Sequence, residues 1–175
     1  MRIKSAFFVI LALMLSISLF GCHKKSEQQQ TIAEFPDNTL EQVIDKQSVT
    51  IDRSQTDDGS NVLRIDAQSP TVVHLFALPD PDIENATLVY QAKLHSENLE
   101  GRAYLEMWCS FPKLGRYFSR GMQSPVSGNT AWTTVSTPFF LKEGQNPDNV
   151  ELNLVIEGKG TVWIDDIRLL QKPLP

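Results

Sequence analysis

Apolar residues recur at every second position along most of the chain from residue 48 onward. Successive side chains of a β-strand point to opposite faces, so this period predicts strands with one buried face and one face in water. The pattern is clear over residues 150–156, where one face carries Val150, Leu152, Leu154 and Ile156. Turn-forming residues separate the segments, and eight or nine such strands indicate an all-β, antiparallel β-sandwich.

The strands are predicted at residues 49–51, 63–67, 71–78, 88–94, 103–111, 132–141, 150–156 and 161–170. Turns are predicted between them at Asp57–Ser60, Pro79–Asp82, Ser127–Asn129 and Glu157–Gly160. Residues Phe111–Met122 are interpreted as a loop. Upstream of the first strand, apolar residues at helical spacing predict one short helix over Asn38–Asp45.

The last predicted strand changes phase in its middle. Val162 and Ile164 share one face, whereas Ile167 and Leu169 have the opposite parity. A regular strand with one wet face cannot bury both pairs, so we predict a bulge at Asp165–Asp166. Two adjacent carboxylates in an apolar strand need partners, and backbone N–H groups or a metal ion would both serve.

The N-terminal segment has the pattern of an export signal. Arg2 and Lys4 precede the apolar run Ala6–Leu15, and polar sequence follows soon after. This pattern predicts a signal peptide over residues 1–21, with an uncleaved transmembrane anchor as the alternative. Residues 19–22 resemble the bacterial lipobox, although Phe20 departs from the small or β-branched residue usual there. The resemblance implies a lipid on Cys22, and hence attachment to a membrane.

The segment after Cys22 predicts a flexible connection. Residues 22–34 begin with a polar stretch that has nothing to bury, so we expect a disordered tether here and a β-sandwich domain over residues 35–175. His23 stands where an aspartate would resemble the inner-membrane retention signal of Gram-negative lipoproteins. The expected location is the bacterial cell envelope, with the outer membrane favoured over the inner in a Gram-negative organism.

Composition excludes several classes of function. The 175 residues carry a net charge of −5, which argues against a nucleic-acid partner because phosphate binding needs a basic surface. Two cysteines exclude a disulfide-rich scaffold, and only Cys109 remains if Cys22 carries a lipid. The three histidines lack metal-ligand spacing, and no nucleophile-elbow motif is present. We predict no enzyme and no cofactor: isolated carboxylates such as Glu106 and Asp165 could form a glycosidase pair, but nothing in the sequence sets their separation.

The C-terminal half resembles a known fold family. Its motifs are Trp132 at a strand start, Phe139–Phe140 near that strand's end, and a closing Gly158–Leu169 segment that contains Asp165–Asp166. This block resembles the closing strands of galactose-binding-like jelly rolls, and is most similar to cellulase-associated carbohydrate-binding modules. The resemblance covers roughly residues 87–175 and implies a jelly roll in which Trp132 and Trp163 are structural.

The same resemblance bears on calcium. Members of this family often hold a structural Ca²⁺ through N-terminal oxygens and the second aspartate of the closing motif, which corresponds to Asp166. The family's opening Asn-Gly-(Asp/Gly)-Phe-Glu motif is missing from this sequence. Calcium requires 6–8 oxygen ligands, so the alternative is that Asp166 accepts hydrogen bonds from backbone amides at the bulge.

The candidate ligand-binding residues lie on one predicted strand face. If Ala103–Phe111 face the core, the opposite face carries Arg102, Tyr104, Glu106, Trp108 and Ser110. Tyr104 and Trp108, ~13 Å apart along a strand, would stack two sugar rings while Glu106 and Arg102 bind hydroxyls.

Two alternatives to this glycan site stay open. In the first, the Phe111–Met122 loop covers the face and packs Tyr117, Phe118 and Met122 on Trp108. The cations of that loop are either solvated or hold an anion; they are Lys113, Arg116 and Arg120. In the second, the domain is a protein-interaction or structural envelope module with a protein partner and no sugar ligand.

Overall fold

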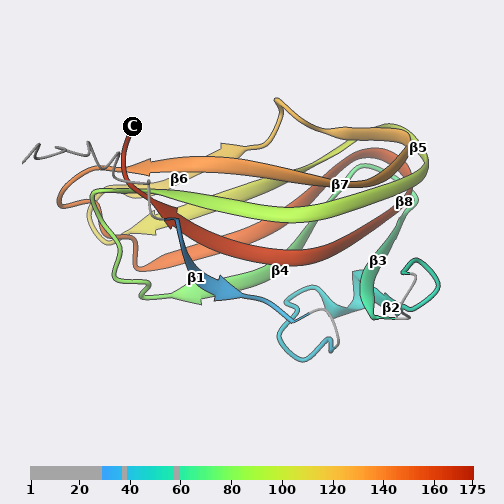
Figure 1. Ribbon diagram of the computed structural model, residues 1–175, viewed down its shortest axis with the longest axis horizontal. Coiled ribbons are helices and arrows are strands. Elements are labelled where there is room, and N and C mark those ends of the chain that lie inside the picture. Colours follow the sequence, from blue (N-terminus) through green and yellow to red (C-terminus); the bar gives the residue numbers. More distant parts are fainter. Residues whose placement is uncertain (1–28, 37–38, 57–59) are drawn as a thin grey trace, which may run out of the picture.

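The computed structural model describes residues 29–36, 39–56 and 60–175. These residues form eight β-strands and one 3-10 turn, Lys46–Ser48, and they contain no α-helix. The strands are β1 (Gln30–Glu34), β2 (Thr50–Asp52), β3 (Val62–Ala67), β4 (Thr71–Pro79), β5 (Ala86–Phe111), β6 (Gly115–Arg120), β7 (Val126–Leu141) and β8 (Asn149–Lys172) (Figure 1). All strand pairs are antiparallel, so the predicted all-β class is confirmed.

Two long strands, β5 and β8, organise the fold. They pair with each other along most of their length, and both fold back at the same end of the molecule (Figure 1). Each therefore contributes to both layers of the sandwich. The front layer contains β4, residues 149–156 of β8, residues 103–111 of β5, and β6. The back layer contains β1, β3, residues 160–172 of β8, residues 86–97 of β5, and β7, with β2 paired to β3.

Glycines allow the two long strands to cross closely where they fold back. Gly101 of β5 pairs with Gly158 of β8, and both have positive φ, +97° and +155°. A Cβ atom on Gly101 would lie 1.8 Å from the carbonyl oxygen of Glu157. One on Gly158 would lie 1.5 Å from the carbonyl oxygen of Glu100. Only glycine fits at either position, because an added methyl group would overlap the partner backbone.

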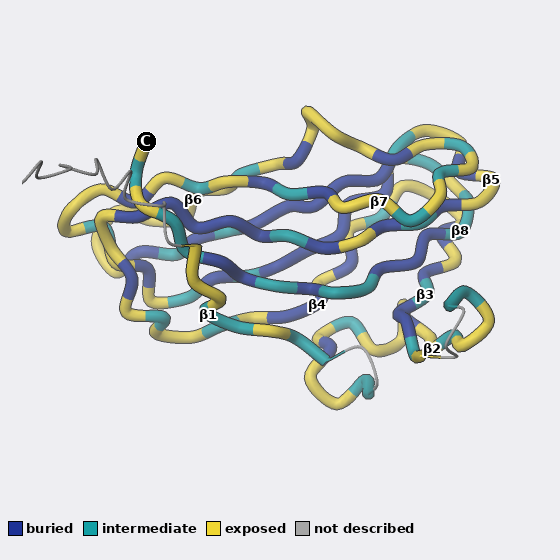
Figure 2. Tube along the Cα trace, in the orientation of Figure 1, coloured by how far each residue is buried: buried dark blue, intermediate teal, exposed yellow. Residues whose placement is uncertain are grey.

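The core lies between the layers and uses the alternation expected from the sequence. Buried stretches alternate with exposed ones along the strands of both layers (Figure 2). Leu88 and Leu94 from the back layer are fully buried, as are Leu105 and Met107 from the front layer. Cys109 belongs to the same cluster, and burial raises the pKa of its thiol to about 12. At neutral pH this thiol therefore stays protonated and poorly reactive.

The bulge predicted at Asp165–Asp166 is present. Gln91 pairs with Arg168 and Lys93 pairs with Asp165, so one intervening residue of β5 faces two of β8. Asp166 has φ +52°, in the left-handed region. The extra residue restores the phase, and Ile164 and Ile167 are both buried in the core.

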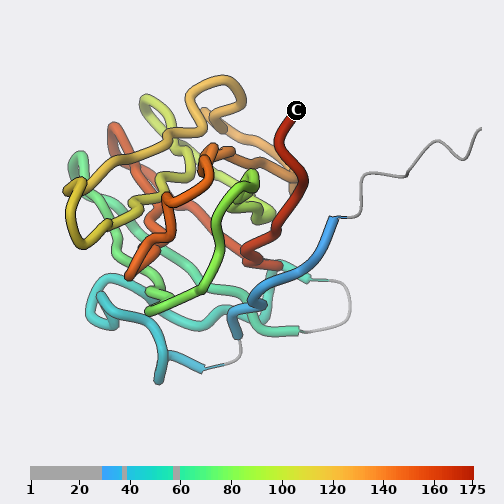
Figure 3. The backbone as a smooth tube through the Cα atoms, turned by 90° about the vertical axis from the view of Figure 1, so that its left-hand side faces the viewer, coloured from blue at the N-terminus to red at the C-terminus, as the bar shows by residue number. Residues whose placement is uncertain are grey.

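The structure corrects the predicted N-terminal part of the domain. Gln30–Glu34 form β1 against the C-terminal part of β8 (Figure 3), so the end of the predicted tether (22–34) is an ordered strand. Residues 39–45 form turns in place of the helix predicted over Asn38–Asp45. The amides of Ile44 and Asp45 donate to the carbonyls of Leu75 and His74, so this end of the segment pairs with β4 and does not continue as a helix. Residues 1–21 and Cys22 lie outside the described part of the chain.

Several predicted turns lie inside continuous strands. Glu157–Gly160 belongs to β8 and Ser127–Asn129 belongs to β7, so these glycine-containing segments bend strands without ending them. The two strands predicted at 88–94 and 103–111 are one strand, β5. The Phe111–Met122 loop contains β6. No helix among the described residues is long and apolar enough to cross a membrane.

Candidate functional site

The outer surface of the front layer, called the front face below, brings the four predicted ligand residues together. Arg102, Tyr104, Glu106 and Trp108 follow one another along the outward side of β5. Their neighbours on β6 and β8 come from distant parts of the sequence: Glu106 pairs with Arg120 on one side and with Asn153 on the other.

Glu106 is the centre of a hydrogen-bond network at the base of this face. Its side chain is only 4% exposed. It accepts hydrogen bonds from Trp108 Nε1 at 2.7 Å, Arg120 Nε at 2.6 Å and Asn153 Nδ2 at 3.2 Å. Burial raises the pKa of the carboxyl, but the three hydrogen bonds and the Arg120 charge lower it more, so the net shift is downward. Glu106 is therefore a buried, ionised and fully engaged carboxylate.

Trp108 lies above this network and remains partly exposed. The Phe118 ring contacts it with centroids 5.0 Å apart, and the Arg116 guanidinium lies 4.7 Å from its ring centroid. Arg116 also bonds Glu151 at 2.5 Å. The packing of Phe118 on Trp108 that one alternative predicted is confirmed, but Phe118 itself is 50% exposed, so the pair forms an accessible aromatic surface.

Tyr104 contradicts the predicted sugar platform. Its side chain lies on the expected face but is only 2% exposed. The hydroxyl donates to Glu157 Oε1 at 2.8 Å, and Arg102 Nε bonds Glu157 Oε2 at 2.6 Å. Burial and this hydrogen bond raise the pKa of Tyr104. Tyr104 and Arg102 therefore form a closed cluster with Glu157, and the aromatic ring that accompanies Trp108 is that of Phe118.

Asn153 is a front-face residue that the sequence reading missed. It is buried, and its Oδ1 has no hydrogen-bond partner among the described residues. Its position was readable from the alternation of residues 150–156, in which polar Glu151 and Asn153 share the face opposite the core residues.

The opposite surface, called the back face, carries a three-ring stack. His95 lies between Trp163 and Trp132, with ring centroids 4.8 Å and 5.5 Å away. Trp163 is buried, as its predicted structural role requires, and its indole donates to Asp52 at 2.9 Å. Trp132 Nε1 donates to the carbonyl of Gln55 at 3.0 Å. The two indoles therefore hold the end of β2 and the residues just after it, through Asp52 and Gln55.

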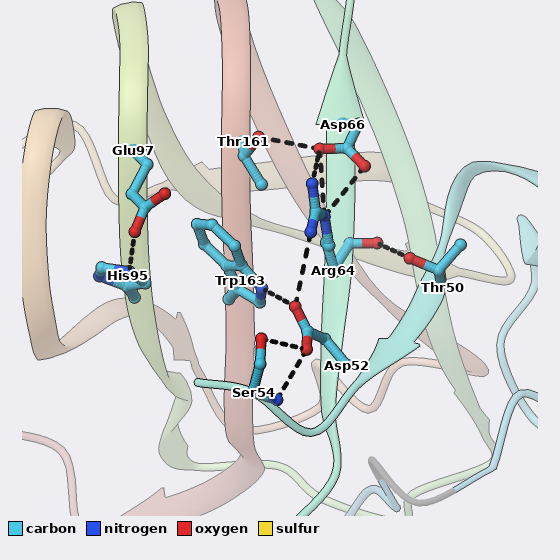
Figure 4. A network of polar contacts seen from close by, with 9 residues as sticks. All are labelled: Thr50, Asp52, Ser54, Arg64, Asp66, His95, Glu97, Thr161 and Trp163. Atoms are coloured by element: carbon cyan, nitrogen blue, oxygen red, sulfur yellow. Dashed lines mark hydrogen bonds and ion pairs between the residues drawn. The ribbon is translucent and has the colours of Figure 1, made fainter. Parts of the chain in front are cut away.

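A polar network surrounds Trp163 (Figure 4). Asp52 accepts hydrogen bonds from the Ser54 amide and from Trp163, and these lower its pKa to about 2. Arg64 lies over the Trp163 ring at 5.3 Å and bonds Asp66 at 2.9 Å. The network ties β2 and β3 to β8 on the back face.

Asp166 does not fit the calcium site suggested by the family resemblance. One carboxylate oxygen lies 2.5 Å from Arg168 Nη2 and the other lies 3.4 Å from Lys93 Nζ. A calcium ion here would meet two cations. The described residues contain no group of three or more His, Cys, Asp or Glu that could hold a metal ion. The alternative needs correction too, because Asp165, not Asp166, accepts the backbone N–H at the bulge, at 2.6 Å.

The remaining sequence candidates are separated or paired. Glu106 lies on the front face and Asp165 on the back face, so they cannot flank one glycosidic bond. Two of the three cations proposed to hold an anion are already paired, because Arg116 bonds Glu151 and Arg120 bonds Glu106.

Comparisons with known proteins agree with the fold. No protein-family model and no curated protein matches the sequence. Solved structures do match: the CBM22-1 xylan-binding domain of Paenibacillus barcinonensis Xyn10C has a TM-score of 0.53 and 10% identity, with 85% of this chain and 95% of that chain covered. A family 30 carbohydrate-binding module has a TM-score of 0.51 and 14% identity, with 81% and 98% covered.

A third match is an enzyme-linked module. The CBM22-1–GH10 modules of Clostridium thermocellum endo-1,4-beta-D-xylanase 10B, complexed with xylohexaose, give a TM-score of 0.52 at 8% identity. The match covers 83% of this chain but 26% of that one, so the chain spans about a quarter of its length. At these identities the likeness shows the fold alone: this chain has the β-sandwich fold of carbohydrate-binding modules.

Proposed function

We propose that this protein is a non-catalytic, saccharide-binding lipoprotein of the bacterial envelope, with its ligand site on the front face. The observation that carries the proposal is the accessible Trp108–Phe118 pair, fixed above the buried carboxylate of Glu106. Aromatic rings stack on the C–H faces of sugars, while the charged groups around them bind hydroxyls. The shared fold with carbohydrate-binding modules supports this function.

The Arg116 guanidinium lies over the Trp108 ring, so it would have to move at least partly aside when a sugar stacks there. An exposed ion pair contributes ~0–1 kcal/mol, and an exposed cation–π contact contributes ~0.5–1 kcal/mol. Displacing Arg116 therefore costs no more than about 2 kcal/mol. The side chain is half exposed, so it is free to move aside and donate to a sugar hydroxyl.

Trp108→Ala is expected to weaken saccharide binding at least about tenfold, because it removes the stacking surface. Binding should be measured by calorimetry against xylohexaose and a panel of cell-wall polysaccharides and peptidoglycan fragments. Phe118→Ala should also weaken binding while leaving the Glu106 hydrogen bonds in place. The matched control is Tyr117→Ala: Tyr117 is 52% exposed but points to the opposite side of β6, paired with Cys109.

Unchanged affinity in folded Trp108→Ala and Phe118→Ala would contradict the front-face site. If no saccharide in the panel binds the wild-type protein, the proposal fails and the protein-partner alternative replaces it.

Cys22→Ala is expected to release the protein from membranes, because a lipid on this cysteine is the proposed anchor. Membrane and soluble fractions are compared by immunoblot, with Cys109→Ala as the control that keeps Cys22. In a Gram-negative host the wild-type protein should fractionate with the outer membrane. Cys22→Ala that remains an integral membrane protein would show that the N-terminal segment is an uncleaved anchor.

A further inference from the structure

We propose a second saccharide site, on the back face, in a pocket of about 520 Å³ beside the segment that follows β2. Its volume lies within the ~300–1,000 Å³ range of small-molecule sites. It is separate from the front-face site, because its walls come from the other layer of the sandwich. The lining residues that carry the argument are Gln55, Thr56, Lys93, Trp132, Thr134 and Asp165.

Two neighbouring rows of side chains on the back layer build this pocket. Lys93 of β5 pairs with Thr134 of β7 on one side and with Asp165 of β8 on the other, which places a hydroxyl, an ammonium and a carboxylate in one row. The next row contains the Trp132–His95–Trp163 stack. An aromatic wall therefore stands beside a polar floor.

The lining side chains are held in place by hydrogen bonds, an ion pair and a ring contact with neighbouring residues. Trp132 is fixed by its bond to the Gln55 carbonyl and by the His95 ring. Lys93 is held by Asp166 at 3.4 Å, and Asp165 accepts the Asp166 amide at 2.6 Å. The bulge provides this arrangement, because it inserts the residue whose amide fixes the Asp165 carboxylate. A site arranged in advance loses little conformational entropy when a ligand binds.

The chemistry of the lining defines the ligand class. An anion would meet the carboxylate of Asp165, and a cation would meet the ammonium of Lys93. The pocket therefore favours a neutral ligand with one flat apolar face, which stacks on Trp132, and several hydroxyls. The hydroxyls would bond the polar lining, which consists of the Gln55 amide, the threonine hydroxyls, Lys93 and Asp165. A neutral pyranose has these properties, so the back-face ligand is a neutral sugar unit.

The three tryptophans provide separate reporters for a test. Each indole N–H has a different acceptor: Glu106 for Trp108, Gln55 for Trp132 and Asp52 for Trp163. The experiment titrates the full-length ¹⁵N-labelled chain in detergent micelles with the methyl β-glycosides of glucose, galactose, xylose and N-acetylglucosamine. Trp→Phe variants assign the three indole signals. At least one of these sugars is expected to shift the Trp132 signal to saturation.

Variants separate the two sites. The Trp132 shift should persist in Trp108→Ala and should need at least tenfold more sugar in Asp165→Asn, which keeps an acceptor for the Asp166 amide. Thr134→Val removes a hydroxyl from the pocket and should weaken binding several-fold. It provides a second test if Asp165→Asn does not fold. Phe140→Ala is the control, because Phe140 is 56% exposed at the far end of the same strand, outside the pocket. Glucuronate and glucosamine, which are charged, should bind more weakly than their neutral counterparts.

The proposal is overturned if none of the four glycosides shifts the Trp132 signal. It is also overturned if the shift has unchanged affinity in the folded Asp165→Asn and Thr134→Val variants. Shifts of Trp108 alone would leave the proposed function standing and remove the second site. Shifts of the Trp132 signal alone would support the back-face site and count against the front-face site.

Discussion

Replacing Gly101 with alanine is expected to destabilise the protein by about 3–5 kcal/mol, or to prevent folding. The new Cβ would lie 1.8 Å from the carbonyl oxygen of Glu157, far inside van der Waals contact. Backbone atoms cannot rotate away as a side chain can, so the crossing of β5 and β8 must open. The φ of +97° adds strain for any residue with a Cβ. Urea denaturation of wild type and variant measures the difference in unfolding free energy.

Gly115→Ala separates the two contributions. Gly115 has nearly the same φ, +90°, but an added Cβ would have no heavy atom within 4 Å. This variant should lose only the backbone strain, about 1 kcal/mol. Gly158→Ala should behave like Gly101→Ala, because its Cβ would lie 1.5 Å from the carbonyl oxygen of Glu100. Equal losses at Gly101 and Gly115 would show that the close crossing of β5 and β8 is not what demands glycine.

The same crossing explains why the sequence predicted the layers better than the connections. Alternating apolar residues identify the buried face of a strand, and this worked for both halves of β5 and β8. Glycine-rich segments such as Glu157–Gly160 mark a sharp change of direction. They do not say whether the strand ends in a hairpin or continues around a corner. That difference is set by pairing with Glu100 and Gly101, which lie far away in the sequence.

The alternation of apolar residues predicted local structure correctly where those residues must face the core. The bulge at Asp165–Asp166 was predictable because Ile164 and Ile167 must both face the core. β1 was not predictable, since its Gln30–Glu34 strand is held by backbone pairing with β8 more than by a buried face of its own. The predicted helix failed for a related reason: the amides of Ile44 and Asp45 bond the carbonyls of β4.

The candidate site shows the same limit. Alternation placed Arg102, Tyr104, Glu106 and Trp108 on one face, as the structure does. It could not show that Tyr104 is buried, because the acceptor of its hydroxyl is Glu157, on another strand. The contact of Phe118 with Trp108 was predicted only in the alternative in which a loop covers the face, and the structure shows that it depends on the β5–β6 hairpin.

Glu106→Ala is expected to destabilise the protein by about 2–4 kcal/mol, because it deletes an almost fully buried carboxylate, and each buried donor that loses its acceptor costs about 1–3 kcal/mol. The substitution leaves the buried donors of Trp108 and Asn153 without their acceptor. Glu106→Gln retains an acceptor and should lose less. The matched control is Glu157→Gln. Glu157 also accepts hydrogen bonds from an arginine and from a tyrosine hydroxyl, but it is 42% exposed, so the expected loss of unfolding free energy is ~0–1 kcal/mol.

The pH dependence of the Glu106 effect has a definite sign. The pKa of Glu106 is lowered in the folded protein, because hydrogen bonds from Arg120, Trp108 and Asn153 outweigh the effect of burial. A lowered carboxyl pKa stabilises the fold fully above the ordinary value of 4.5, and this contribution disappears as the pH falls through the folded-state pKa. The stability difference between wild type and Glu106→Gln should therefore be largest near neutral pH and should shrink below about pH 4.5.

Thermal or urea unfolding of both proteins between about pH 7 and pH 3 measures this difference directly. Subtracting the unfolding free energy of the variant from that of the wild type cancels the contributions of other carboxyls with lowered pKa, such as Asp52 and Asp66, because both proteins have them. A difference that stays constant down to about pH 3 would mean that the charge of Glu106 does not stabilise the fold. In that case the network under Trp108 would act through shape and neutral hydrogen bonds, and Glu106→Gln should retain full saccharide affinity. A difference that shrinks on acidification predicts that Glu106→Gln also weakens binding, because Trp108 then depends on an ionised acceptor for its position.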